Sequence, residues 1–159
     1  MEEEKRKIKL TPGIAKQKIE SWCAYQERSH YEVREKLYSY GLYSSDVEQI
    51  ITSLITDNFL NEERFALAYV SGKFKIKKWG RVKIKQGLKF KRVSEYCIKK
   101  GINSIDPDEY EKTIHELIEK KSRSVKEKNE FKRKSKIAQY IISRGFESDL
   151  VWNALKEEI

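Results

Sequence analysis

The residues of this chain that are best suited to chemistry are basic, and they are concentrated in one part of the sequence. Between Lys73 and Lys100 there are 12 lysines and arginines and a single acid, Glu95. Residues 1–70 hold 10 basic and 12 acidic residues, whereas residues 71–159 hold 24 and 13. Positive charge of this density attracts a polyanion, and nucleic acid is the polyanion that we expect. The alternative is a solvated basic face without a dedicated partner.

The basic residues are spaced so that several could share one face of a helix. Arg81, Lys85, Lys89 and Arg92 are separated by four, four and three residues, a spacing that would let them follow successive phosphates. A second cluster extends the pattern towards the C-terminus. The predicted nucleic-acid contacts are Lys78, Arg81, Lys85, Lys89, Lys91, Arg92, Lys132, Arg133, Lys134, Lys136 and Arg144. The interleaved aromatics Phe74, Trp79, Phe90 and Phe131 could stack on bases, but core packing is the favoured role.

The sequence has no pattern that supports catalysis. His30 and His115 lie far apart without the spacing of metal ligands, and Cys23 and Cys97 form no CxxC pair. A Walker loop, a GxGxxG segment and a nucleophile elbow are all absent from the sequence. We therefore predict a binding protein that is not an enzyme and that needs no metal and no cofactor.

The elements that must position the basic residues are predicted to be helices. Residues that cap helix starts recur along the chain, and apolar residues follow helical spacing between them. The predicted caps are Thr11, Ser29, Ser45, Asn61, Ser94, Asp106 and Ser148. Gly41, Gly80 and Gly145 lie where helices should end. One segment, residues 73–90, also alternates with the period of a strand, and the pattern alone leaves helix and strand open there.

The helices repeat as a helix, a short turn with an apolar residue, a cap and another helix. This predicts an all-α fold, in which an N-terminal helix precedes an elongated array of about three tandem three-helix repeats, the last truncated. The predicted ranges are 1–10 for a disordered tail, 11–28 for the N-terminal helix, and 29–78, 79–128 and 129–159 for the repeats. The chain lacks an apolar run of about 20 residues and the apolar stretch of a signal peptide, so we expect a cytoplasmic protein without membrane contact.

The order of these features resembles the RecX family, bacterial regulators of the RecA recombinase, over nearly the whole chain. The run Asn58 to Ala66 is similar to the family's signature, and Arg144-Gly145-Phe146 also fits. The resemblance is carried by Arg28, Ser29, Leu37, Phe59, Leu60, Asn61, Phe65, Ala66, Trp79 and Gly80. We expect most of the signature to serve caps and core. Asn58 stands where the family often has glycine, and Lys91-Arg92-Val93 replaces a frequent Lys-Gly-Ile.

The resemblance implies a curved array that lies along a RecA filament on single-stranded DNA. It also implies inhibition of the RecA ATPase and of strand exchange, in recombination, DNA repair and the SOS response. The expected partners are the RecA filament, single-stranded DNA and, secondarily, double-stranded DNA, and we expect a monomer. The alternatives are a sequence-specific DNA-binding regulator with helix-turn-helix-like units and a purely structural adaptor.

Overall fold

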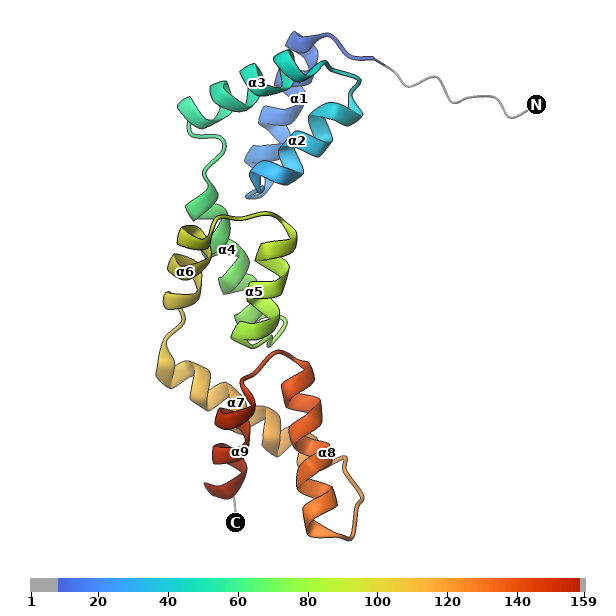
Figure 1. Cartoon of the computed structure of the whole chain (residues 1–159), viewed down its shortest axis with the longest axis vertical. Helices are drawn as coiled ribbons and strands as arrows, with labels where there is room; N and C mark the ends of the chain where they lie inside the picture. The colour runs from blue at the N-terminus through green and yellow to red at the C-terminus, as the bar shows by residue number, and fades with distance from the viewer. Residues whose placement is uncertain (1–8, 158–159) are drawn as a thin grey trace, which may run out of the picture.

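The computed structural model describes residues 9–157, and these residues form nine α-helices and no β-strand (Figure 1). The helices are α1 (Pro12–Tyr25), α2 (His30–Ser39), α3 (Ser44–Thr56), α4 (Glu62–Lys75), α5 (Arg81–Phe90), α6 (Glu95–Asn103), α7 (Pro107–Ser122), α8 (Glu130–Ser143) and α9 (Ser148–Glu157). The all-α prediction is confirmed, and the ambiguous segment 73–90 contains the end of α4 and all of α5. Most of the predicted disordered tail, residues 1–8, lies outside the described residues.

Side-chain caps begin most of the helices where the sequence predicts them. Ser29 is buried, and its hydroxyl accepts from the Glu32 N–H at 3.0 Å. The side chains of Thr11, Asn61, Ser94 and Asp106 likewise accept backbone N–H groups at the starts of α1, α4, α6 and α7. The prediction for Ser45 is wrong, because α3 begins at Ser44 and its N-cap, Tyr43, makes no side-chain capping hydrogen bond. The prediction for Ser148 is also wrong, because Ser148 is the first residue of α9 and not its cap.

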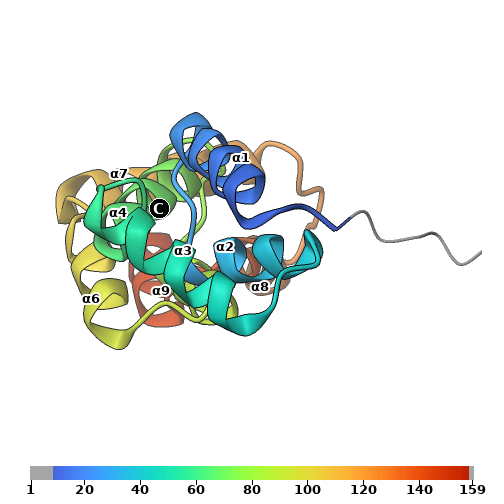
Figure 2. The same cartoon turned by 90° about the horizontal axis from the view of Figure 1, so that it is seen from above.

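The helices pack in three consecutive groups that are stacked along one axis, as Figure 1 and the view from above in Figure 2 show. The groups are α1–α3, α4–α6 and α7–α9, called units 1, 2 and 3 below. The predicted repeat ranges are offset from this packing by one helix. Leu60 still belongs to the core of unit 1, whereas Phe65 and Ala66 on the next helix pack into the core of unit 2. Each of α4 and α7 therefore opens a unit, although the sequence analysis placed it at the end of one.

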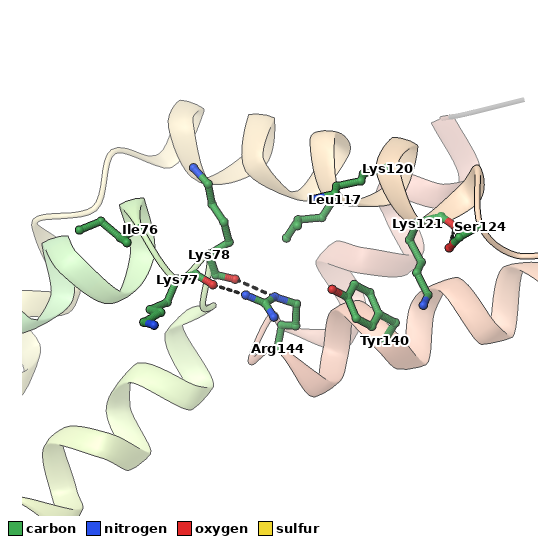
Figure 3. A pocket seen from close by; sticks show the side chains of 9 residues that line it. All are labelled: Ile76, Lys77, Lys78, Leu117, Lys120, Lys121, Ser124, Tyr140 and Arg144. Carbon is green, nitrogen blue, oxygen red and sulfur yellow. Dashed lines mark hydrogen bonds between the residues drawn. The ribbon is translucent and has the colours of Figure 1, made fainter.

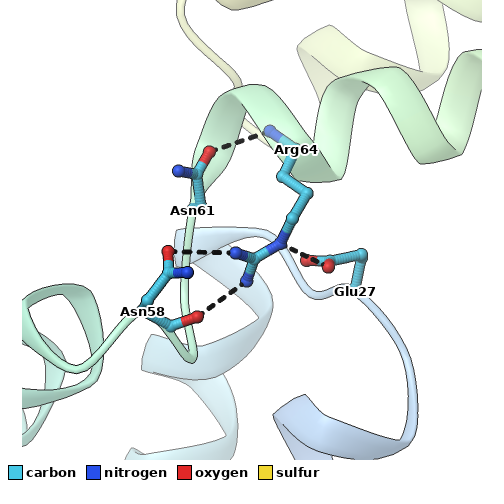
Figure 4. A network of polar contacts seen from close by, with 4 residues as sticks. All are labelled: Glu27, Asn58, Asn61 and Arg64. Carbon is cyan, nitrogen blue, oxygen red and sulfur yellow. Dashed lines mark hydrogen bonds and ion pairs between the residues drawn. The ribbon is translucent and has the colours of Figure 1, made fainter.

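Polar side chains join unit 1 to unit 2, and their two cores are separate. The guanidinium of Arg64 donates to Glu27 Oε1 at 2.5 Å and to both Oδ1 and the carbonyl of Asn58 at 3.0 Å (Figure 4). Asn58 has φ +64°, so it adopts the left-handed turn expected of it. Close by in the sequence, the Asn61 side chain accepts from the Arg64 N–H at 2.9 Å. We call this network the Arg64 clasp.

Backbone contacts join unit 2 to unit 3. The Gly80 N–H donates to the Arg144 carbonyl and the Val82 N–H donates to the Gly145 carbonyl, both at 2.9 Å. The approach is so close that a Cβ built on Gly80 would lie 2.3 Å from the Gly145 oxygen. Gly145 itself has φ +99°, a conformation that favours glycine. Both positions therefore require glycine, and we call this contact the glycine seam.

Aromatic and charged side chains next to the glycine seam add further contacts between units 2 and 3. Tyr110 is fully buried, and its ring lies between those of Phe74 and Phe146, with centroid distances of 5.8 and 5.2 Å. Its hydroxyl donates to Glu147, which also accepts from the Arg81 guanidinium at 2.7 Å. Burial and the Glu147 carboxylate raise the pKa of Tyr110 above its ordinary range, so the phenol stays protonated at neutral pH. One continuous core thus spans units 2 and 3.

Replacing Gly80 by alanine is expected to lower the free energy of unfolding by about 1–3 kcal/mol, because the new methyl group would collide with rigid backbone. Gly72 is the matched control. It lies inside α4 with nothing within 4 Å of a built Cβ, so Gly72→Ala should raise the free energy of unfolding by about 0.5–1 kcal/mol. Urea unfolding followed by circular dichroism measures both values. Equal stability of the two variants would contradict the glycine seam.

Arg81→Gln is expected to lower the free energy of unfolding by about 1–2 kcal/mol, because it leaves the half-buried Glu147 without its cation. Lys85 lies on the same helix but is exposed, so Lys85→Gln should change stability by less than about 0.5 kcal/mol. The same urea titration compares them. A structural role for Arg81 would be excluded if its variant were as stable as the Lys85 variant.

Candidate nucleic-acid interface

The basic residues predicted to form one track do not all face solvent. Arg81 donates to Glu147, and its guanidinium lies 3.9 Å from the centre of the Tyr110 ring. Lys91 forms an ion pair with Glu32 at 3.2 Å, and the Arg92 guanidinium lies 4.5 Å from the Tyr31 ring centre. Arg92 has φ +57°, so the turn keeps its left-handed residue without the glycine frequent in the family. These three side chains hold neighbouring units together.

The other two members of the predicted track remain exposed and lie together. Lys85 and Lys89 line one side of a groove of about 490 Å³ between α5 and α6. Lys99 lies on the opposite helix and adds a third cation, while Glu95 is the one carboxylate among the residues described as lining the groove. Tyr96 is 63% exposed and offers an aromatic surface at the same place. This α5–α6 groove is suited to phosphate contacts.

The second predicted cluster lies at the start of α8, and most of its charges have partners. Arg133 donates to the Ser122 carbonyl at 2.6 Å, which ties α8 to the end of α7. Lys134 pairs with Glu130 at 3.7 Å and Lys136 with Glu127 at 3.0 Å. Exposed ion pairs contribute at most about 1 kcal/mol, so a phosphate could replace either carboxylate. Lys132 is exposed.

A third basic surface lies where units 2 and 3 meet, and the sequence analysis found only part of it. This surface is a hollow of about 470 Å³ whose lining includes five cationic side chains. Figure 3 shows the residues that line it. The cations are Lys77, Lys78, Lys120, Lys121 and Arg144. The remaining lining residues are Ile76, Leu117, Ser124 and Tyr140. We call this site the junction hollow; the prediction included Lys78 and Arg144 but missed Lys120, Lys121 and Tyr140.

The junction hollow is strongly electropositive. Its lining contains no carboxylate, and none of its five cations forms an ion pair with another residue in the part of the chain that the structure describes. Arg144 donates to the carbonyls of Lys77 and Lys78, which fixes the turn that carries those two lysines. Lys121 Nζ lies 4.3 Å from the centre of the Tyr140 ring. The charge of the hollow is therefore available to an anionic ligand.

The residues of the predicted signature serve mainly the core and the unit boundaries. Leu37, Leu60 and Ala66 are fully buried, Phe65 is buried, and Phe59 packs on the core of unit 1. Arg28 donates to the Trp22 carbonyl at 3.2 Å, with its guanidinium 3.9 Å from the Trp22 ring centre. Trp79 packs on the core of unit 2 next to Gly80.

One cluster that the sequence analysis missed carries groups able to ligate a metal. His115 Nε2 lies 3.4 Å from a Glu157 oxygen and 3.9 Å from a Glu111 oxygen. One ligand atom from each of the three residues lies within 4.8 Å of the others. Both carboxylates are well exposed, and exposed acidic groups are common beside histidine without a metal, so the arrangement alone does not indicate a metal site. A spacing of four residues between Glu111 and His115 was the signal in the sequence.

None of the helices in the described residues is both long and apolar enough to cross a bilayer. The basic surfaces described above lie on units 2 and 3. They are exposed grooves and hollows on α5, α6, α7 and α8 and on the turns next to these helices.

Comparison with family models matches both of these units. Residues 61–102 match the second three-helix domain of RecX, and residues 108–155 match its third three-helix domain. These ranges coincide with α4–α6 and α7–α9, the same grouping that the packing gives.

Curated relatives agree with the family models. The chain is 27% identical over 137 residues to the regulatory protein RecX of Bacillus cytotoxicus, covering 86% of this chain and 51% of the relative. It is 31% identical over 124 residues to that of Clostridium perfringens strain 13, covering 77% and 58%. The chain thus spans between half and three fifths of the length of these relatives.

Solved structures show the same fold. A crystal structure of RecX from Lactobacillus salivarius superposes with a TM-score of 0.84 at 21% identity, covering 92% of this chain and 95% of that one. A second crystal structure of a regulatory protein RecX gives a TM-score of 0.79 at 22% identity, with coverages of 87% and 68%. Family models, relatives and fold agree, and this chain belongs to the RecX family of regulatory proteins.

Proposed function

We propose that this chain binds the filament that RecA forms on single-stranded DNA and inhibits the RecA ATPase and strand exchange. Membership of a family of regulatory proteins supports a regulatory, non-enzymatic role. The observation that carries the proposal is the series of cationic surfaces along units 2 and 3, in the α5–α6 groove and the junction hollow. Such surfaces match the repeated negative charge of a nucleic-acid backbone.

The charge distribution supports different proposed contacts for the three units. Lys85, Lys89 and Lys99 in unit 2 and the cations of the junction hollow would neutralise DNA phosphates. Unit 1, in the half of the chain with an excess of acids, would contact the recombinase. A column of three stacked units that lies along the filament would exclude a second DNA strand and hinder the motion between RecA subunits that ATP turnover needs. We propose that the protein acts in this way as a cytoplasmic monomer.

Charge reversal on the α5–α6 groove tests this proposal. The double variant Lys85→Glu and Lys89→Glu should lose most of its inhibition of the RecA ATPase, because both residues are exposed and would then repel phosphates. Arg81 is left intact, since its loss would destabilise the protein. The measurement is ATP hydrolysis by RecA on single-stranded DNA against the concentration of this protein.

A matched control reverses the same amount of charge elsewhere. Lys112 on α7 and Lys156 on α9 are exposed and line neither the α5–α6 groove nor the junction hollow, so Lys112→Glu with Lys156→Glu should inhibit nearly as well as the unchanged protein. Circular dichroism verifies that both variants keep their helical content. Full inhibition by the groove variant would refute the proposed contact face.

The salt dependence of binding separates this proposal from its rivals. Binding to RecA-coated single strands should weaken with salt, with a slope of log K against log salt of about −0.7 for each phosphate contacted. A structural adaptor would show almost no slope. A sequence-specific regulator with helix-turn-helix-like units would prefer one operator-sized duplex among several and leave RecA activity unchanged, an outcome that would overturn the filament proposal.

A further inference from the structure

We propose that the junction hollow binds one nucleotide unit of a single-stranded nucleic acid, with its phosphate on the lysines and its sugar and base against the apolar floor. This inference deepens the proposed function, because it assigns a site at which the chain would hold a single strand directly, without RecA. The site lies between units 2 and 3, apart from the α5–α6 groove.

The composition of the hollow identifies the kind of ligand. Four lysines and an arginine surround it, and Ile76, Leu117 and Tyr140 supply carbon surface between the charges (Figure 3). A ligand that fits this lining must be both anionic and partly apolar, as a nucleotide is and inorganic phosphate is not. The volume of about 470 Å³ falls within the range of pockets that take small ligands, whereas a duplex is too wide to enter.

Helix ends alone do not explain this concentration of charge. Lys120 and Lys121 lie in the last turn of α7, where a cation is stabilised by the helix dipole. That effect accounts for basic residues at one terminus. It does not require that residues from three separate segments, the α4–α5 turn, α7 and the α8–α9 turn, converge on one hollow whose described lining lacks an acid.

The geometry of the hollow is fixed before any ligand binds. The Arg144 guanidinium donates to the Lys77 and Lys78 carbonyls, so it holds the backbone of the turn from which both lysines extend. Lys78 has φ +56° and is held in this unusual conformation beside the glycine seam. Two lysines on a fixed turn lose less freedom on binding an anion than two on a flexible loop.

The hollow also continues along the molecule. A neighbouring depression shares Lys121, Ser124 and Tyr140 with it and adds Lys126 and Lys136. The residues that the two depressions share make them continuous, so the cationic lining extends along α7 and α8 beyond the junction hollow. A strand is therefore a better match than a free mononucleotide.

Binding of a fluorescein-labelled oligothymidylate of about 15 nucleotides, followed by anisotropy without RecA, tests the inference. The double variant Lys120→Gln and Lys121→Gln removes two cations while keeping side chains that suit a helix. It should weaken binding by about tenfold and reduce the magnitude of the salt slope by about 1.4. Lys18→Gln with Lys156→Gln makes the same change of charge on remote helices and should alter binding by less than about twofold.

A second variant removes charge without a risk to folding. Lys78→Gly relieves the left-handed backbone at this position, so its thermal stability should be equal or higher while its affinity falls. An oligonucleotide with 5-iododeoxyuridine, irradiated in the complex, should crosslink to the peptide that contains Tyr140. Equal weakening by the hollow variants and the remote control, or a crosslink confined to α5 and α6, would overturn the inference.

Competition distinguishes a strand from other sources of phosphate. Unlabelled single strands should displace the probe at far lower concentration than a duplex, ATP or inorganic phosphate. If ATP or phosphate competes as well as the strand at equal phosphate concentration, the hollow is a site for free anions and the inference fails. If the duplex competes as well as the single strand, the proposed entry of one nucleotide fails.

The RecA ATPase assay with the same variants separates this inference from the proposed function. If the hollow variants lose strand binding but still inhibit RecA fully, the hollow is supported as the strand-binding site and the filament contact must lie elsewhere. Unchanged strand binding by the Lys120 and Lys121 variant would reject the hollow, even if the α5–α6 groove variant loses inhibition as proposed.

Discussion

The contact between Gly80 and Gly145 is the constraint on which the arrangement of units 2 and 3 depends. Two backbone segments meet so closely that neither can carry a side chain, and two N–H groups at the start of α5 find their acceptors in the α8–α9 turn. N–H groups at a helix N-terminus have no partner within the helix. Unit 3 therefore supplies the hydrogen-bond acceptors that the first turn of α5 in unit 2 lacks. The same contact brings residues 66 positions apart, Lys78 and Arg144, into one hollow.

Different kinds of interaction hold the units together at the two boundaries. The boundary between units 2 and 3 has backbone hydrogen bonds, a buried tyrosine between two other aromatic rings and one continuous core. The boundary between units 1 and 2 has the Arg64 clasp and a few exposed or half-buried charged contacts, and the cores on either side are separate. Salt screens charged contacts much more than it affects a packed backbone.

The sequence predicts the helices well because their signals are local. Caps such as Ser29 and Asn61 and stripes such as that of α3 need only a few neighbouring residues, and the structure places them as expected. The grouping into units is a different matter. A helix between two turns can pack backwards or forwards, and only contacts such as those of Phe65 and Ala66 show that α4 packs forwards, onto α6. Local patterns could not predict the junction hollow for the same reason, since its five cations come from three segments that are far apart in the sequence. The spacing of the basic residues also could not show that Arg81 pairs with Glu147, 66 residues further along the chain, and so does not belong to the exposed track.

The two boundaries differ in what a change of angle between their units would disrupt. Bending between units 2 and 3 would break backbone hydrogen bonds and open a continuous core, whereas bending between units 1 and 2 would mainly disturb polar and charged side-chain contacts. Bending should therefore cost less free energy between units 1 and 2. A column that adjusts more easily at one boundary can fit one end to a long, repetitive surface while the other end keeps its shape.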